Sequence, residues 1–430
     1  MTVILHKHNQ NNMKHTMSSK SITLPQNSIF SVAEVEKFRN ETRGTNNVVH
    51  LNNAGAGLMP NSVTKAQLDH IALEAEIGGY EAAAHKAAAI SEFYDQAALL
   101  FNCKATNIAF TASATDSYTR ALSSIPFKQG DVILTDKDDF VSNQIQFLSL
   151  QKRLGIKIVH IQNSPLGGVD LNDLASKLKT LQPRLLAITH IPTNSGLVQP
   201  VLEIASIYYN HLQSATENTW YILDACQSVG QMKLDVKELH CDFLSVTGRK
   251  FLRGPRGTGI LFVSNKALRK GLEPMFIDMR GAEWTEKDAY RQQLDAKRFE
   301  DWEFAYSTIL GTSSAIAYCR AIGEDRIWGQ VKLLSNILRE GLQSLNGVRI
   351  LDKGPELAGL VTFTVRGSDP VLMVNELLKR NINVVPSYRA FGVIDFDEKG
   401  VKWAVRASPH YYNTLDELQY FIDSLKEIVG

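Results

Sequence analysis

Short apolar runs rich in β-branched residues alternate with helical stretches through the first two thirds of the chain. The runs are NIAF, DVILTD, KIVHIQ, LLAITHI, TWYILDA, DFLSVTG and TGILFV. Turn residues or helical stretches bound each run, which is typical of buried parallel strands. Strands and helices in this alternation favour an α/β layer fold with an open, mainly parallel sheet.

A different pattern begins near residue 299. Long helical sequence runs to about residue 345 and is followed by GVRIL, GLVTFTV, VLMVNELLKRN, INVVPS, VKWAVRAS and TLDELQYFIDSLKEIV. These segments predict the order strand, strand, helix, strand, strand, helix, and therefore a smaller C-terminal α+β domain. We divide the chain into a disordered or arm-like tail over 1–28, a helical segment over 29–46, a large domain over 47–305 and a small domain over 306–430.

Length and composition limit the classes of function. The chain has 430 residues, 44% of them hydrophobic, and a formal net charge of +1. A charge so near zero gives no strong field that favours nucleic acid or an anionic membrane. No apolar run reaches the ~18–20 residues that a membrane helix needs. We therefore expect neither nucleic acid nor a membrane as a partner.

The cysteines and histidines point to a cytoplasmic protein without a metal site. The four cysteines are scattered along the chain and include no CxxC pair, which indicates reduced thiols rather than a disulfide framework. They are Cys103, Cys226, Cys241 and Cys319. The polar N-terminal segment lacks the apolar core of a secretory signal. Its histidines are interpreted as solvated residues rather than metal ligands; they are His6, His8 and His15.

Polar residues follow two of the predicted strands, and open α/β sheets bind ligands at the carboxyl ends of their strands. After NIAF comes a helix start rich in small and hydroxyl residues, which includes Ala114 and Thr115. Its N–H groups suit a phosphate, although an ordinary Ser/Thr N-cap explains the same pattern. After WYIL comes Asp224, with Gln227 one helical turn later. A carboxylate there either pairs with a cationic heterocyclic nitrogen or caps the next helix.

The stretch TGRKFLRGPRGTG, residues 247–259, follows the predicted strand DFLSV. It is interpreted as a charged surface turn, a nucleotide loop or the site of one reactive amine. A Walker loop places its lysine after the glycines and a hydroxyl residue directly after the lysine. Here Lys250 precedes the glycine-rich turn, and Phe251 follows the lysine, which argues against a nucleotide loop. A neighbouring cation and partial burial both lower a lysine pKa, and Arg249 supplies the neighbour. Thr247 is placed to contact a phosphate.

A phosphate-binding helix start, a strand-end aspartate and a strand-end lysine in one α/β domain converge on pyridoxal 5′-phosphate (PLP). The aspartate keeps the pyridine nitrogen protonated, and the lysine holds the aldehyde as a Schiff base. These features together predict a PLP-dependent enzyme.

Six segments, in order along the chain, carry a family resemblance: LNNAGAG, FTASATDS, HIPTNSGLVQP, LDACQSVGQ, TGRKFLRGPRGTG and VRASPHYYN. Over residues 30–430 the chain resembles class V aminotransferase-fold enzymes, the superfamily of cysteine desulfurases, selenocysteine lyase, kynureninase and isopenicillin N epimerase. The resemblance implies PLP-dependent transferase fold type I.

The resemblance also implies roles for individual residues. Lys250 matches the lysine that binds PLP and then moves protons, and Asp224 matches the partner of the pyridine nitrogen. Arg406 matches the arginine that grips the substrate carboxylate, a bidentate task that suits guanidinium. The other implied cofactor contacts are Ala114, Thr115, Phe140, Gln227, Thr247 and either Thr193 or Asn194, and Asn52 is the implied second substrate contact.

The chain departs from the cysteine desulfurases at three places. Arg249 and Phe140 stand where those enzymes carry histidines, and the segment VPSYRAFGVIDFDEKGVKWAVRAS contains no cysteine where they carry a nucleophilic one. Cys226 is interpreted as a small buried hydrophobe. Persulfide transfer is therefore not expected.

The family's chemistry leaves several reactions open. Proton removal from the α-carbon leads to transamination, β-elimination or racemisation, and the same residues serve all three. We expect an aminotransferase or a C–S β-lyase, with an epimerase as the alternative and a non-catalytic PLP-fold protein as a remote one. Arg280, Tyr388 and Arg389 are candidates to meet the substrate side chain.

A homodimer with shared active sites is also expected. The segment 276–281 follows the large-domain strands, where the family often reaches across a dimer; an ordinary surface loop is the alternative. Arg253 and Arg256 are interpreted as turn or dimer-interface cations.

Overall fold

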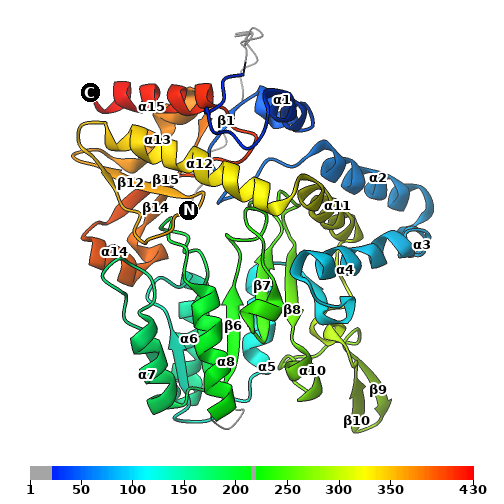
Figure 1. Ribbon diagram of the computed structural model, residues 1–430. Helices are drawn as coiled ribbons and strands as arrows, with labels where there is room; N and C mark the ends of the chain where they lie inside the picture. Colours follow the sequence, from blue (N-terminus) through cyan, green and yellow to red (C-terminus); the bar gives the residue numbers. More distant parts are fainter. Residues whose placement is uncertain (1–21, 215–218) are drawn as a thin grey trace.

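The computed structural model describes residues 22–214 and 219–430. A seven-stranded sheet forms the centre of the larger, lower part of the molecule (Figure 1). Its order is β2-β8-β7-β6-β5-β3-β4, and its strands are β2 (Ile108–Thr111), β3 (Val132–Thr135), β4 (Lys157–His160), β5 (Leu185–Thr189), β6 (Trp220–Asp224), β7 (Phe243–Thr247) and β8 (Gly259–Val263). Strands β7, β6, β5, β3 and β4 pair in parallel. The prediction of a mainly parallel sheet is confirmed.

Strand β8 is the exception, and its predicted parallel orientation is wrong. It pairs antiparallel with both β7 and β2. No helix lies between Thr247 and Gly259, and a strand that returns through a turn without a crossover helix must run antiparallel to its neighbour. The stretch that carries Lys250 is therefore the connection between two antiparallel neighbours.

Alternate residues of the central strands face opposite layers of helix. Tyr221 and Leu223 of β6 belong to a core cluster with residues of α7 (Leu171–Leu181) and α8 (Val201–Ser214). Trp220 and Ile222 belong to a second cluster with residues of α5 (Ala114–Ser124) and α6 (Val141–Leu154). This period-2 alternation buries both faces of the sheet and leaves the strand ends as the place for polar chemistry.

A four-stranded antiparallel sheet, in the order β11-β12-β15-β14, forms the smaller upper part (Figure 1). Its elements are β11 (Val348–Ile350), β12 (Val361–Val365), β14 (Val385–Tyr388) and β15 (Trp403–Ala407), with helices α12 (Glu324–Gln343), α13 (Pro370–Lys379), α14 (Val393–Lys399) and α15 (Leu415–Val429). The segment INVVPS divides, because β13 (Ile382–Asn383) leaves this sheet and pairs in parallel with β1 (Val49–His50).

The predicted long helix over the region 299–345 is two helices. Helix α11 (Tyr306–Ile322) ends at Gly323, whose φ of 96° lies in the left-handed region, and α12 begins at once. Helix α11 packs on α2 (Asn61–Ile77) and α4 (Ala87–Phe101), whereas α12 packs on α15 and the small sheet. The break at Gly323 thus separates a helix of the lower layer from one of the upper layer.

The N-terminal helix α1 (Val32–Asn40) lies beside the start of the C-terminal helix α15 (Figure 1). A capping box between Ser31 and Glu34 starts it, and Arg39 pairs with Glu417 at 2.8 Å. The predicted tail falls mostly outside the described residues, as do His6, His8 and His15. None of the helices in the described part of the chain is long and apolar enough to cross a membrane.

Candidate functional site

A small cavity of about 100 Å³ lies where the carboxyl ends of the central strands meet the start of α5. Most of the residues predicted to bind the cofactor line it. The lining residues are Ser113, Ala114, Thr115, Phe140, Thr189, Ile191, Thr193, Asp224, Cys226, Gln227, Thr247, Arg249 and Lys250. Segments distant in sequence thus meet at one edge of the sheet, as open α/β folds require of a ligand site.

Lys250 presents a buried amine to this cavity. It is 8% exposed, and its Nζ lies 5.9 Å from the centre of the Phe140 ring. The pKa of Lys250 is lowered to about 8, mainly by burial; Cys226 and Asp224 oppose this shift, and the positive charges of Arg249 and Arg406 add to it. A lysine with such a pKa is substantially neutral in mildly alkaline solution and is able to act as a nucleophile or base.

Asp224 ends β6 and is held by two donors. Its Oδ1 accepts from the backbone N–H of Cys226 at 2.9 Å, and its Oδ2 accepts from Asn143 Nδ2 at 3.2 Å. Asn143 Nδ2 also donates to Asp139 Oδ1 at 2.9 Å. One amide therefore bridges two buried carboxylates, and burial raises the pKa of Asp139 to about 6. Sequence reasoning found Asp224 but not Asn143 or Asp139.

The start of α5 offers backbone N–H groups to the cavity. Ser113 is the N-cap, and its hydroxyl accepts from Asp116 N at 3.1 Å. The N-cap interpretation is therefore confirmed. Phosphate binding stays a prediction, and it is compatible with the cap because the cap uses one N–H while the first residues of a helix have no intrahelical acceptor. Ala114 and Thr115 line the cavity together with Thr247 from the end of β7. This corner suits an anion such as phosphate.

Thr193 links the two remaining polar residues predicted for the site. Its hydroxyl accepts from Gln227 Nε2 at 3.1 Å and from Arg406 Nη1 at 2.7 Å. Among the described residues, the buried atoms Gln227 Oε1 and Arg406 Nε have no hydrogen-bond partner. Burial, followed by the charge of Arg249, lowers the pKa of Arg406 to about 10. Arg406 is not among the residues that line the cavity and is linked to it through Thr193; its unpaired donor and the unpaired Gln227 acceptor fit polar ligand groups.

Asn194 lies outside this cavity. Its side chain accepts from Ser387 Oγ of β14 at 2.5 Å and donates to the carbonyl of Phe391, between β14 and α14, at 3.0 Å. Of the two neighbouring residues predicted as alternatives, Thr193 is the one that lines the cavity, and Asn194 links that segment to β14 and the residues after it.

Comparison with known proteins decides the family. The family model described as "Aminotransferase class-V" matches residues 49–421. The chain belongs to the class V aminotransferase family. Class V aminotransferases depend on PLP, so the predictions of a PLP-dependent enzyme of this family and of its fold are confirmed.

Relatives and solved structures agree with the class V assignment. A probable cysteine desulfurase of Pyrococcus abyssi is 29% identical over 92% of this chain and 97% of its own, and one of Methanothermobacter thermautotrophicus is 26% identical over 82% and 87%. The structure of a cysteine desulfurase from Thermococcus onnurineus has a TM-score of 0.82 at 28% identity, covering 92% and 98%. A cystine C–S lyase, at 24% identity with a TM-score of 0.78 over 90% and 99%, shares the fold.

The loop over residues 52–58 packs against the backbone of Arg249 and Lys250 in this class V enzyme. Gly57 N donates to the carbonyl of Arg249 at 2.8 Å, and a Cβ at Gly57 would lie 2.6 Å from the carbonyl oxygen of Lys250. Glycine is needed there because a side chain would displace the Lys250 backbone. Asn52 is outside the cavity lining and forms a β-bridge with Ser408.

Arg253 is neither a surface-turn nor an interface cation, and that interpretation is wrong. It is 2% exposed and donates to Tyr411, Thr42 and the carbonyl of Leu58. The rings of Tyr318, Tyr411 and Tyr412 surround its guanidinium at 4.7–5.6 Å. Its backbone N–H donates to the Lys250 carbonyl at 2.9 Å. Nothing in the local sequence distinguishes this arginine from Arg256.

The three residues suggested to meet the substrate side chain lie elsewhere. Arg280 pairs with buried Glu300 at 2.5 Å, and exposed Arg389 pairs with Asp397 at 2.5 Å. Neither arginine, nor Tyr388, lines the cavity. Both arginines are thus engaged in ion pairs within the chain.

Only one of the four thiols lines the cavity. That thiol belongs to Cys226, and burial raises its pKa well above the ordinary value, so it stays protonated. Cys103, Cys241 and Cys319 are not among the lining residues. The segment between β14 and β15 forms α14 and contains no cysteine.

A larger cavity of about 620 Å³ opens on the other side of the segment 189–199. His190, Val198 and Gln199 face it, whereas Thr189, Ile191 and Thr193 face the smaller one. The smaller cavity holds the lysine and the strand-end aspartate, so it is the candidate active site.

Proposed function

We propose that this protein is a PLP-dependent C–S β-lyase that acts on a sulfur-containing amino acid such as cysteine. The observation that carries the proposal is the buried Lys250 amine, which shares a cavity with Asp224 and a helix start. Relatives named cysteine desulfurases, and a structural neighbour named cystine C–S lyase, indicate sulfur amino acids.

The residues of the cavity fit PLP group by group. The start of α5 and Thr247 suit its phosphate, Asp224 suits its ring nitrogen and Phe140 its ring face. Gln227, with an unpaired Oε1, lies beside Thr193 on the other side of the cavity. PLP bound there supplies an aldehyde that reacts with amines and a ring that accepts electrons from the substrate α-carbon.

The side chains of this protein then supply positioning and proton transfer. Arg406, whose Nε is buried and unpaired, binds the substrate carboxylate. Lys250 removes the proton from the α-carbon, and the C–S bond breaks with its electron pair going to sulfur, which leaves as a thiol after taking up a proton. Hydrolysis of the remaining fragment gives a keto acid and ammonia.

We do not expect the protein to retain the sulfur of the substrate as a persulfide. Persulfide transfer needs an accessible thiolate, whereas burial keeps Cys226 protonated and the other three thiols lie outside the cavity. The absence of a desulfurase-type cysteine remains a prediction, as does the assignment of each site residue.

We also propose a cytoplasmic homodimer. A contiguous stretch of chain exposes large apolar side chains, with Phe276 86%, Met279 67% and Trp284 79% exposed. They lie on the loop before β9 (Ala282–Glu286) and on its hairpin with β10 (Ala289–Gln292), which projects from the lower part of the molecule (Figure 1). Exposed apolar patches of this kind mark protein interfaces, and four free cysteines suit a reducing compartment.

An amino-acid panel separates the reactions. The purified protein is loaded with PLP and incubated with cysteine, cystine, alanine and aspartate, each with and without a keto-acid acceptor. The proposal predicts pyruvate, ammonia and a sulfur product from a sulfur amino acid without an acceptor. Keto acid formed only with an acceptor would indicate an aminotransferase, and loss of optical rotation alone an epimerase.

A further inference from the structure

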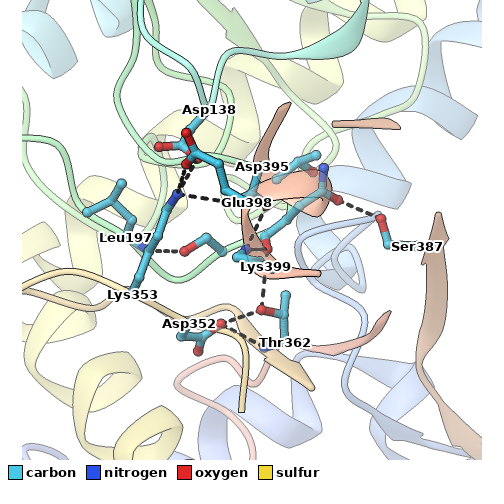
Figure 2. Close-up of polar contacts among 12 residues, drawn as sticks. Asp138, Leu197, Asp352, Lys353, Thr362, Ser387, Asp395, Glu398 and Lys399 are labelled. Carbon is cyan, nitrogen blue, oxygen red and sulfur yellow. Dashed lines mark hydrogen bonds and ion pairs between the residues drawn. The ribbon is translucent and has the colours of Figure 1, made fainter. Parts of the chain in front are cut away.

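A lysine of the small domain joins the two domains close to the candidate active site. Lys353, in the loop after β11, places its Nζ 2.9 Å from Asp138 Oδ1 and 3.1 Å from Asp395 Oδ1. Asp138 belongs to the large domain and Asp395 to α14 of the small domain. Figure 2 shows the Lys353 side chain reaching toward Asp138, with Asp395 and Glu398 beside it.

The charges around Lys353 balance across the domain boundary. Lys399 pairs with Asp395 at 2.7 Å and Lys137 pairs with Glu398 at 2.9 Å, so three lysines face three carboxylates. The side chains of Asp138 and Asp395 are 0% and 4% exposed, and that of Lys353 is 22% exposed. Buried carboxylates without a cation are costly, so this set of charges favours one relative placement of the domains.

Asp138 is followed directly by two residues of the candidate site. Asp139 accepts from Asn143, which donates to Asp224, and Phe140 lines the cavity. Asp138 N donates to Asp136 Oδ1 at 2.9 Å, so the turn is held on the large-domain side as well. A displacement of Asp138 therefore moves the residues that hold Asp224 and cover the cofactor's ring position.

Helix α14 also contacts a second segment that lines the cavity, the one that carries Thr193. Lys399 Nζ donates to the carbonyl of Asn194 at 3.0 Å. The residue before Asn194 is Thr193, which contacts Gln227 and Arg406. The small domain therefore fixes both Phe140 and Thr193, which reach the cavity from separate large-domain segments.

We propose that Lys353 is a positioning residue of the active site, whose ion pair with Asp138 sets Asp139 and Phe140 against the cofactor when the two domains are packed together. The proposal rests on the proposed PLP function. The electrostatics agree with the proposal. Burial raises the pKa of Asp138 to about 6, and Lys353 opposes that rise. The carboxylates of Asp138 and Asp395 raise the pKa of Lys353 above its usual range, because their effect outweighs that of burial.

The test compares PLP-loaded Lys353→Met with Lys332→Met. Lys332 also forms a small-domain ion pair, with Glu356 at 2.9 Å, but its side chain is 42% exposed. Its ion pair does not involve the segments that carry Phe140 and Thr193. We expect Lys353→Met to shift the absorbance and near-UV dichroism of bound PLP and to lower kcat roughly tenfold or more, because small misplacements in a site reduce rates steeply. Lys332→Met is expected to match the parent.

A double variant separates positioning from mere folding. Asp138→Asn with Lys353→Met removes the unpaired buried carboxylate, so stability is expected to recover while the PLP spectrum and kcat stay altered. A parent-like spectrum and kcat in Lys353→Met, or their full return in the double variant, would overturn the proposal. The PLP band of the parent, measured first, tests the proposed function separately.

Discussion

Two lysines of this enzyme, the buried Lys250 and the half-buried Lys353, have opposite electrostatics. Among the described residues no carboxylate pairs with Lys250, and burial with two nearby arginines lowers its pKa to about 8. Lys353 contacts two carboxylates, which raise its pKa despite burial. The difference shows that the charged groups that face a lysine decide whether its pKa falls or rises when water is partly excluded.

The largest expected effect concerns the Lys250 amine itself. Lys250→Ala should lower the rate of product formation by roughly 10²–10⁴-fold, the range associated with loss of a general acid or base. Steady-state assays on the substrate found with the amino-acid panel measure this, with Lys266→Ala as a control, because Lys266 pairs with Asp242 outside the cavity. Comparable loss in both variants would contradict the assignment.

Removing the structural cation should destabilise the fold. Lys353→Met leaves Asp138 and Asp395 without that partner, which is expected to lower the free energy of unfolding by about 3 kcal/mol at pH 7.5. Because the pKa of Asp138 is about 6, that carboxyl gains a proton as the pH falls, and the loss should shrink at pH 5. Urea unfolding at the two pH values checks this, and an equal loss at both would argue against an unpaired Asp138 as its cause.

Removing the reactive amine should have the opposite effect on stability. At pH 7 Lys250 is protonated in both the folded and unfolded states, and its folded pKa of about 8 lies below the ordinary lysine pKa of 10.5. The buried charge then costs on the order of 3 kcal/mol. Lys250→Met should stabilise the PLP-free protein at pH 7 by up to that amount, and the gain should decline between pH 8 and 10.5. A destabilised Lys250→Met protein at pH 7 would oppose this account.

The smallest effect should come from a neighbour of Lys250. Arg249 lowers the Lys250 pKa, although less than burial does, so Arg249→Gln should shift the alkaline rise of kcat/KM to higher pH by roughly half a unit to one unit. A pH–rate profile detects the shift, and Arg256→Gln serves as a comparison at a more exposed position of the same stretch. A shift to lower pH would reverse the inferred sign.

Sequence reasoning found the residues that local patterns mark. Lys250, Asp224 and the α5 start each follow a strand, and strand ends in an α/β sheet converge. Arg253, Asn143 and Lys353 were missed, because their partners lie far away in the sequence and no local motif distinguishes them. The orientation of β8 was missed for a related reason: a β-branched run shows burial but not direction.

The most direct test of the central claim is to identify the residue that binds the cofactor covalently. The PLP-loaded protein is reduced with borohydride, digested and analysed by peptide mass spectrometry, with Lys250→Ala treated in parallel. The account predicts a phosphopyridoxyl group on Lys250 in the parent protein and none at that position in the variant. A label on another lysine, or a parent protein that binds no PLP, would contradict it.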